Sequence, residues 1–69
     1  MPHMTKRKQD ILREATRLFA ESGFDGVSVA QIAKAAGVSQ GAVFRHFPSK
    51  EALLQRIFQD IRESFLNSK

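Results

Sequence analysis

The sequence of 69 residues contains no cysteine, which excludes disulfide bonds and thiol chemistry. With only two histidines, it also lacks the ligand set of a structural zinc site. No apolar run approaches the roughly 20 residues that a membrane-spanning helix needs, and no signal-peptide pattern follows the first methionine. We therefore expect a soluble, cytoplasmic protein of a reducing compartment, with no bound metal or cofactor.

The residue groupings on which enzymes depend are also missing. There is no paired carboxylate, no nucleophile beside a base and no glycine-rich loop that would cradle a phosphate. We therefore reject an enzymatic function. The length allows one small domain, and 42% hydrophobic residues are not the composition of a disordered chain.

Acidic residues are absent from the middle of the chain. None occurs from residue 26 to residue 50, a stretch that contains Lys34 and Arg45, and residues 6–8 form a basic cluster. The formal net charge of +4 favours a polyanionic partner. On charge alone, an ordinary solvated surface explains the pattern equally well.

The same middle stretch predicts two short helices joined by a tight turn. Ser28 and Gln31 have the spacing of a capping box at the start of the first helix. Gly37 suits the left-handed residue that closes this helix, and Ser39 suits the N-cap of a second helix over residues 40–46. This is the size of a helix-turn-helix, whose second helix fits the major groove of DNA.

A longer helix is predicted before this motif, over residues 6–22. Its apolar residues follow an i, i+1, i+4, i+7, i+8 pattern: Ile11, Leu12, Ala15, Leu18 and Phe19. Thr5 is its candidate N-cap. Gly23 ends it, and Phe24 is expected to pack back on Phe19 in a Schellman closure.

Another helix is predicted over residues 50–67, after Pro48 ends the preceding helix and Ser49 provides an N-cap. It would be roughly 27 Å long. The other helices can cover its near end, which carries Leu53, Leu54, Ile57 and at most Phe58. They cannot also cover its far end, which carries Ile61, Phe65 and Leu66. Uncovered apolar surface usually belongs to a partner, so we expect the natural protein to continue beyond Lys69.

Two stretches resemble the DNA-binding domain of the tetracycline-repressor (TetR) family. They are ATRLFAESGFDGVSVAQIA over residues 15–33 and GVSQGAVFRHFPSKEALL over residues 37–54. The resemblance implies a dimeric transcription regulator, most often a repressor, that binds a near-palindromic operator in double-stranded DNA. It also implies a C-terminal domain, absent from this chain, that dimerises and binds a small-molecule inducer.

The expected fold class is all-α, a homeodomain-like three-helix bundle with a helix-turn-helix and a fourth connecting helix. Residues 1–4 would be a disordered or vector-derived terminus, and residues 5–47 the DNA-binding domain. Residues 48–69 would begin the helix that links this domain to the absent C-terminal domain. The core is assigned to Phe19, Ile32, Val43, Phe47 and Leu54.

The outward residues of helix 40–46 are assigned to base contact: Gln40, Gly41, Ala42 and Arg45. Gln40 stands where the family places a base contact, and its amide can bond adenine N6 and N7, unless it is merely solvated. A helical glycine costs about 1 kcal/mol relative to alanine; a close backbone approach to DNA would explain this cost at Gly41, and neutral drift is the alternative. Ala42 can touch a thymine methyl group. Arg45 can read guanine, bind a phosphate or remain an exposed charge.

A second group is assigned to the DNA phosphates: Lys6, Arg7, Ser28, Phe44, His46 and Lys50. The basic first turn of helix 6–22 opposes the helix dipole, and a phosphate would supply the counter-charge; a solvated terminus is the alternative. His46 and Lys50 match family positions that meet phosphate. Ser28 would share its hydroxyl between cap and phosphate, or serve as a cap alone. Phe44 stands where most members have tyrosine, so it lacks the phosphate-binding hydroxyl and is left to pack on a sugar, a thymine methyl group or the core.

The competing hypothesis is a protein-interaction module. In that case the apolar far end of helix 50–67 is the functional surface, and DNA binding is incidental.

Overall fold

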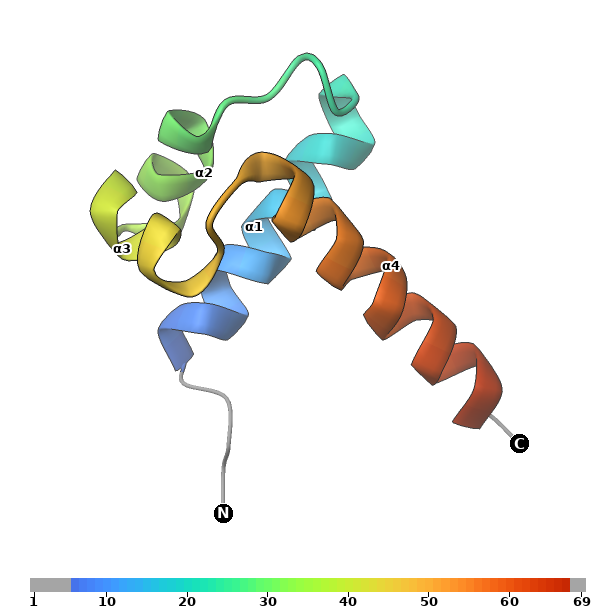
Figure 1. The fold of residues 1–69 in the computed structure, drawn as a ribbon. Helices are drawn as coiled ribbons and strands as arrows, with labels where there is room; N and C mark the ends of the chain where they lie inside the picture. Colours follow the sequence, from blue (N-terminus) through green and yellow to red (C-terminus); the bar gives the residue numbers. More distant parts are fainter. Residues whose placement is uncertain (1–5, 68–69) are drawn as a thin grey trace.

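The computed structural model describes residues 6–67, which form four helices and no strand (Figure 1). They are α1 (Lys6–Ser22), α2 (Val29–Ala36), α3 (Gln40–His46) and α4 (Lys50–Asn67). The all-α class and the predicted helix boundaries are confirmed. The predictions for residues 1–4, for Thr5 as an N-cap and for a continuation past Lys69 lie outside the described residues.

The ends of α2 are set by residues next to it in the sequence. Ser28 Oγ accepts a hydrogen bond from the Gln31 N–H at 3.1 Å, and Gln31 Oε1 accepts one from the Ser28 N–H at 2.7 Å. This is the predicted capping box. Gly37 adopts the left-handed conformation with φ 74°, and its N–H and that of Val38 reach carbonyl oxygens of the last turn. The chain is therefore redirected into α3 within a few residues.

The two helices that follow begin at the predicted serine caps. Ser39 Oγ accepts from the Ala42 N–H at 3.0 Å, and Ser49 Oγ accepts from the Ala52 N–H at 3.0 Å. Phe47 ends α3 in extended conformation, immediately before Pro48. Local hydrogen bonding thus explains where α3 and α4 start and where α3 stops.

The end of α1 differs in one detail from the expectation. Gly23 has φ 79°, and its N–H donates to the Phe19 carbonyl at 2.8 Å, which is the single bond of an αL closure instead of the Schellman pair. The ring contact is confirmed, because the Phe24 and Phe19 centroids lie 5.5 Å apart. The Gly26 N–H then bonds the Gly23 carbonyl at 3.2 Å, which closes a turn over residues 23–26.

The core lies where α1, α2, α3 and the first half of α4 meet (Figure 1). Its buried apolar residues are Ile11, Leu12, Ala15, Val27, Ile32, Ala33, Val43, Phe47, Leu53 and Ile57. The core assignments of Ile32, Val43 and Phe47 are confirmed. Phe19 is partly buried and packs against this cluster.

The core assignment of Leu54 was wrong. Leu53 is completely buried, whereas Leu54 is only half-buried and lies outside the core cluster. Leu53 and Ile57 are one turn apart and turn the same face of α4 toward the other helices. Leu54 follows about 100° further round the helix, at the edge of that face.

The second half of α4 projects beyond the bundle (Figure 1). Its large apolar side chains are exposed: Phe58 by 59%, Ile61 by 57%, Phe65 by 81% and Leu66 by 69%. The expectation of an uncovered far end is confirmed, and the uncovered surface already begins at Phe58. None of the helices in residues 6–67 combines the length and apolar character needed to cross a lipid bilayer.

Candidate nucleic-acid interface

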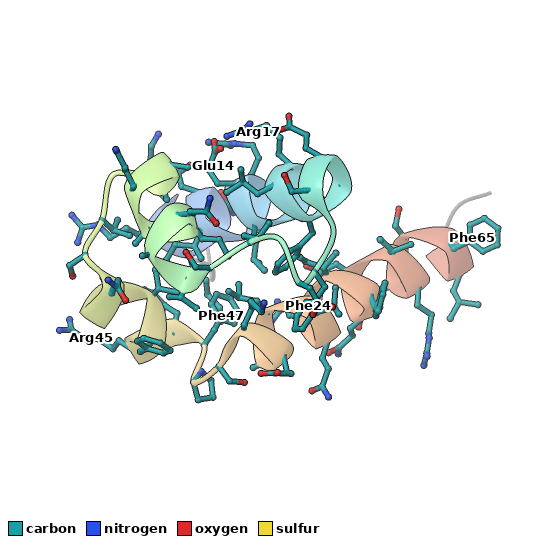
Figure 2. All side chains as sticks on the ribbon, turned by 90° about the horizontal axis from the view of Figure 1, so that it is seen from above. Glu14, Arg17, Phe24, Arg45, Phe47 and Phe65 are labelled. Atoms are coloured by element: carbon teal, nitrogen blue, oxygen red, sulfur yellow. The ribbon has the colours of Figure 1, made fainter. Side chains whose placement is uncertain are left out.

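Helix α3 is held by two side chains and presents the rest of its surface to solvent. Val43 is completely buried and Phe47, its C-cap, is 4% exposed. Because these residues are four apart, they face the core together. Gln40, the first residue of α3, and Arg45 are both exposed, and Figure 2 shows Arg45 at the end of the molecule away from Phe65. Ala42 is half-buried beside the Ser39 cap.

Gly41 is exposed in α3, and neither its packing nor its backbone conformation requires a glycine. A Cβ atom built on it would meet only Ser39 Oγ, at 3.8 Å, which is an ordinary van der Waals contact. Its backbone is helical, without a positive φ. Alanine would therefore fit and would favour the helix by about 1 kcal/mol. The packing and conformation of the described residues leave this glycine unexplained.

Phe44 is the apolar member of the outward surface. Its ring is 45% exposed and does not belong to the core cluster, so the core alternative for this residue is not supported. A phenyl ring has no hydrogen-bond donor, so Phe44 cannot bond a phosphate oxygen. Contact with nucleic acid would be restricted to apolar groups such as a deoxyribose or a thymine methyl.

The first turn of α1 lies beside the C-terminal end of α3. Lys8 Nζ stands over the Phe47 ring, 5.5 Å from its centroid. Lys6 and Arg7 precede it and are exposed, and the first turn of α1 contains no acidic residue. His46 closes α3 nearby, half-buried, with its ring 6.4 Å from the Phe47 ring. The fold thus brings together basic groups predicted from two distant segments.

Ser28 occupies the exposed start of α2. Its oxygen accepts the capping bond from Gln31, which leaves the hydroxyl hydrogen able to donate. Both uses foreseen from the sequence are compatible with this geometry.

Lys50 is placed differently from the other assigned phosphate contacts. Its Nζ donates to the Phe24 carbonyl at 2.8 Å and to the Val27 carbonyl at 3.0 Å, and it lies 4.1 Å from the centroid of the Phe24 ring. The side chain is half-buried against the loop between α1 and α2. The partners are 26 and 23 residues away, and no local pattern signals such a contact.

The charges of the described residues are distributed unevenly. Ion pairs occur within α1 and within α4, between Arg13 and Asp10, Arg17 and Glu14, Arg17 and Glu21, and Arg56 and Asp60. The hydrogen bond and charge of Glu14, followed by Glu21, raise the pKa of Arg17 above its ordinary value, so this group stays charged. Within residues 6–67, no ion pair involves Lys34 or Arg45, and no cluster of potential metal ligands is found. The helix-turn-helix surface therefore keeps its positive charge.

Comparison with known proteins gives concordant matches. Residues 11–57 match the family described as "Bacterial regulatory proteins, tetR family". The chain is 45% identical over 51 residues to the HTH-type transcriptional regulator YerO of Bacillus subtilis, covering 74% of this chain and 18% of that protein. It is also 45% identical over 51 residues to the HTH-type transcriptional repressor Rv1474c of Mycobacterium tuberculosis, covering 74% of this chain and 27% of that protein.

A crystal structure assigned to the tetR family of transcription regulators, from Shewanella sp. PV-4, superposes with a TM-score of 0.85 at 48% identity. The match covers 88% of this chain and 32% of that one. The chain therefore spans about a fifth to a third of the length of these proteins.

Proposed function

Because this chain belongs to the tetR family of bacterial regulatory proteins, whose members are transcriptional regulators and not enzymes, we propose that it binds double-stranded DNA sequence-specifically through α3. The observation that carries the proposal is the outward surface of α3. It presents the Gln40 amide and the Arg45 guanidinium, and at Gly41 it has space for a methyl group. The stretch around these residues contains no acidic residue. A helix with these dimensions fits the major groove.

Base contacts are proposed for Gln40, Gly41, Ala42 and Arg45. The Gln40 amide suits adenine N6 and N7, and the Arg45 guanidinium suits guanine O6 and N7. Gly41 allows the helix backbone to approach the bases closely. The exposed ring of Phe44 adds an apolar contact with a sugar or a thymine methyl group.

Phosphate contacts are proposed for Lys6, Arg7, Ser28 and His46. Lys6 and Arg7 directly precede Lys8, whose ammonium lies over the Phe47 ring at the end of α3. Ser28 stands at the N-terminus of α2, where helix dipole and hydroxyl both favour an anion. Contacts of this kind fix the orientation of the domain on the duplex without reading sequence.

The complete regulator is proposed to be a homodimeric, ligand-responsive repressor. The repressor Rv1474c and the regulator YerO are about four and about six times as long, respectively, as the stretch they share with this chain. Chain segments outside this one would supply the dimer contact and an inducer site, with α4 as the connection. Two domains spaced about one DNA turn apart would require a near-palindromic operator.

Selection of binding sites from random duplex DNA, at two salt concentrations, tests this function. We expect one enriched sequence, lost in Gln40→Ala and in Arg45→Ala. The matched controls are Gln55→Ala and Arg62→Ala, exposed residues of α4 that should leave the selected sequence unchanged. Binding no tighter to duplex than to heparin or single strands contradicts the proposal.

The exposed apolar end of α4 favours a second candidate, a protein-interaction module. It predicts association that increases with concentration and is lost in Ile61→Ser. Sedimentation of both proteins without DNA decides this. Association that persists in Ile61→Ser would show that the apolar end of α4 does not mediate it.

A further inference from the structure

The Lys50 ammonium is engaged by contacts within the protein. It bonds two main-chain carbonyls, at 2.8 Å and 3.0 Å, and lies 4.1 Å from the centre of the Phe24 ring. Two of the three N–H donors of the ammonium are used by these oxygens, and the face of the Phe24 ring attracts its positive charge. Hydrogen bonds from a charged donor are stronger than neutral ones, and a half-buried carbonyl pair is costly to abandon.

These contacts join the first residue of α4 to the loop that follows α1. The Phe24 ring beneath the ammonium is itself packed on Phe19, with centroids 5.5 Å apart (Figure 2 shows Phe24 at the start of α4). Lys50 is the first residue of α4, held there by the Ser49 cap. One side chain therefore connects α4 to the end of α1.

The second carbonyl extends the connection to α2. The carbonyl of Val27 and the N–H of Ser28 belong to one peptide unit. Lys50 donates to its oxygen at 3.0 Å, and its N–H donates to Gln31 Oε1 at 2.7 Å. Bonds on both sides of a peptide polarise it in the same direction and strengthen each other. The capping box that starts α2 is thus the end of a hydrogen-bonded chain that begins at Lys50.

We propose that Lys50 is a positioning residue for the DNA interface and does not bind a phosphate. It fixes the loop 23–28, and with it the Ser28 end of α2, against the start of α4. This inference rests on the proposed function, since it assigns Lys50 a part in orienting the DNA-binding surface. It replaces the phosphate contact expected from the sequence.

Comparison of Lys50→Met with Lys6→Met tests the proposal. Methionine keeps the apolar stem and removes the charge in both variants. The probe is a labelled 20-base-pair duplex of random sequence, titrated at several salt concentrations. A lysine that contacts phosphate lowers the slope of log K against log salt by about 0.9 when removed.

We expect the slope of log K against log salt to fall by about 0.9 in Lys6→Met, while its Tm stays unchanged. Lys50→Met should keep the slope, lower the Tm by about 5–15 °C and accelerate amide exchange from Gly26 to Gln31. A reduced slope in Lys50→Met overturns the proposal whatever its Tm, and so does an unchanged Tm with unchanged exchange.

If Lys50→Met does not fold, the wild-type protein provides the measurement. Nitrogen-15 NMR of lysine ammonium groups should show Lys50 with restricted motion and little change when the duplex is added. Rapid rotation, or a shift as large as that of Lys6 on DNA addition, overturns the proposal.

Absence of salt-dependent binding by the wild type would contradict the proposed function instead. The Tm and amide exchange of a folded Lys50→Met variant would still decide whether Lys50 holds the loop.

Discussion

Two glycines, Gly26 and Gly41, have opposite surroundings. A Cβ atom on Gly26 would overlap the main-chain carbonyl oxygen of Ser22, because the turn after α1 folds tightly back on the helix end. A Cβ atom on Gly41 would meet nothing closer than 3.8 Å. The first glycine is therefore required by the fold, whereas the second costs the isolated domain stability.

We predict that Gly41→Ala raises the free energy of unfolding by about 0.5–1 kcal/mol, because alanine restricts the unfolded chain and favours the helix. The same change should weaken duplex binding, because the added methyl group occupies the proposed closest approach to DNA. Urea unfolding and a duplex titration measure the two effects. Unchanged duplex affinity would contradict the role given to Gly41.

Gly26→Ala should act in the opposite direction on stability. Relief of the overlap requires the backbone of the turn to move, and we expect a loss of about 1–3 kcal/mol. Urea unfolding of both alanine variants under the same conditions compares them directly. A Gly26→Ala protein as stable as the wild type would show that the turn can relax at no cost.

At the scale of the element, α3 depends on its ends. It has seven residues, and isolated helices shorter than about 12–15 residues are marginal in water. Its start is capped by Ser39, and Val43 and Phe47 anchor it to the core. The helix proposed to read DNA is therefore held in shape by its cap and its packing more than by its own propensity.

We predict that Ser39→Ala costs about 1 kcal/mol, because the Ala42 N–H loses its capping acceptor at the exposed start of α3. Ser64→Ala, in the exposed part of α4, is the matched control and should change stability by less than about 0.5 kcal/mol. Thermal unfolding of both variants provides the measurement. Equal effects of the two substitutions would argue against the cap.

At the scale of the whole molecule, a small core serves four helices. A domain of this size is stable by only about 3–10 kcal/mol. The core takes one face of the first half of α4, and the second half extends into solvent with its apolar side chains exposed. Loss of one fully buried leucine thus threatens the entire fold, whereas changes at the far end of α4 do not.

Leu53→Ala and Leu54→Ala should differ in stability, because the two neighbouring leucines differ in burial. We expect Leu53→Ala to lose about 2–5 kcal/mol, enough to unfold much of the population, because Leu53 is completely buried. Leu54→Ala should lower the free energy of unfolding clearly less, because Leu54 is only half-buried. Circular dichroism during thermal unfolding compares them, and similar losses in both variants would contradict the core described here.

The sequence alone determined the features that depend on near neighbours. The capping box of Ser28, the left-handed Gly37 and the caps Ser39 and Ser49 were all predictable, because their hydrogen bonds join residues within four positions of each other. The assignment of Val43 and Phe47 to the core likewise left Gln40 and Arg45 outside it, and both are exposed. Their assignment to particular DNA groups remains a proposal.

The tertiary structure decided what depends on how the helices pack. It buried Leu53 instead of Leu54, and it directed Lys50 to carbonyl oxygens 26 and 23 residues away. It also showed that Gly26 is crowded and Gly41 is not. The physical reason is one of range: a cap or a helical face follows from positions along the chain, whereas a cross-helix contact exists only once the angle and rotation of each helix are fixed.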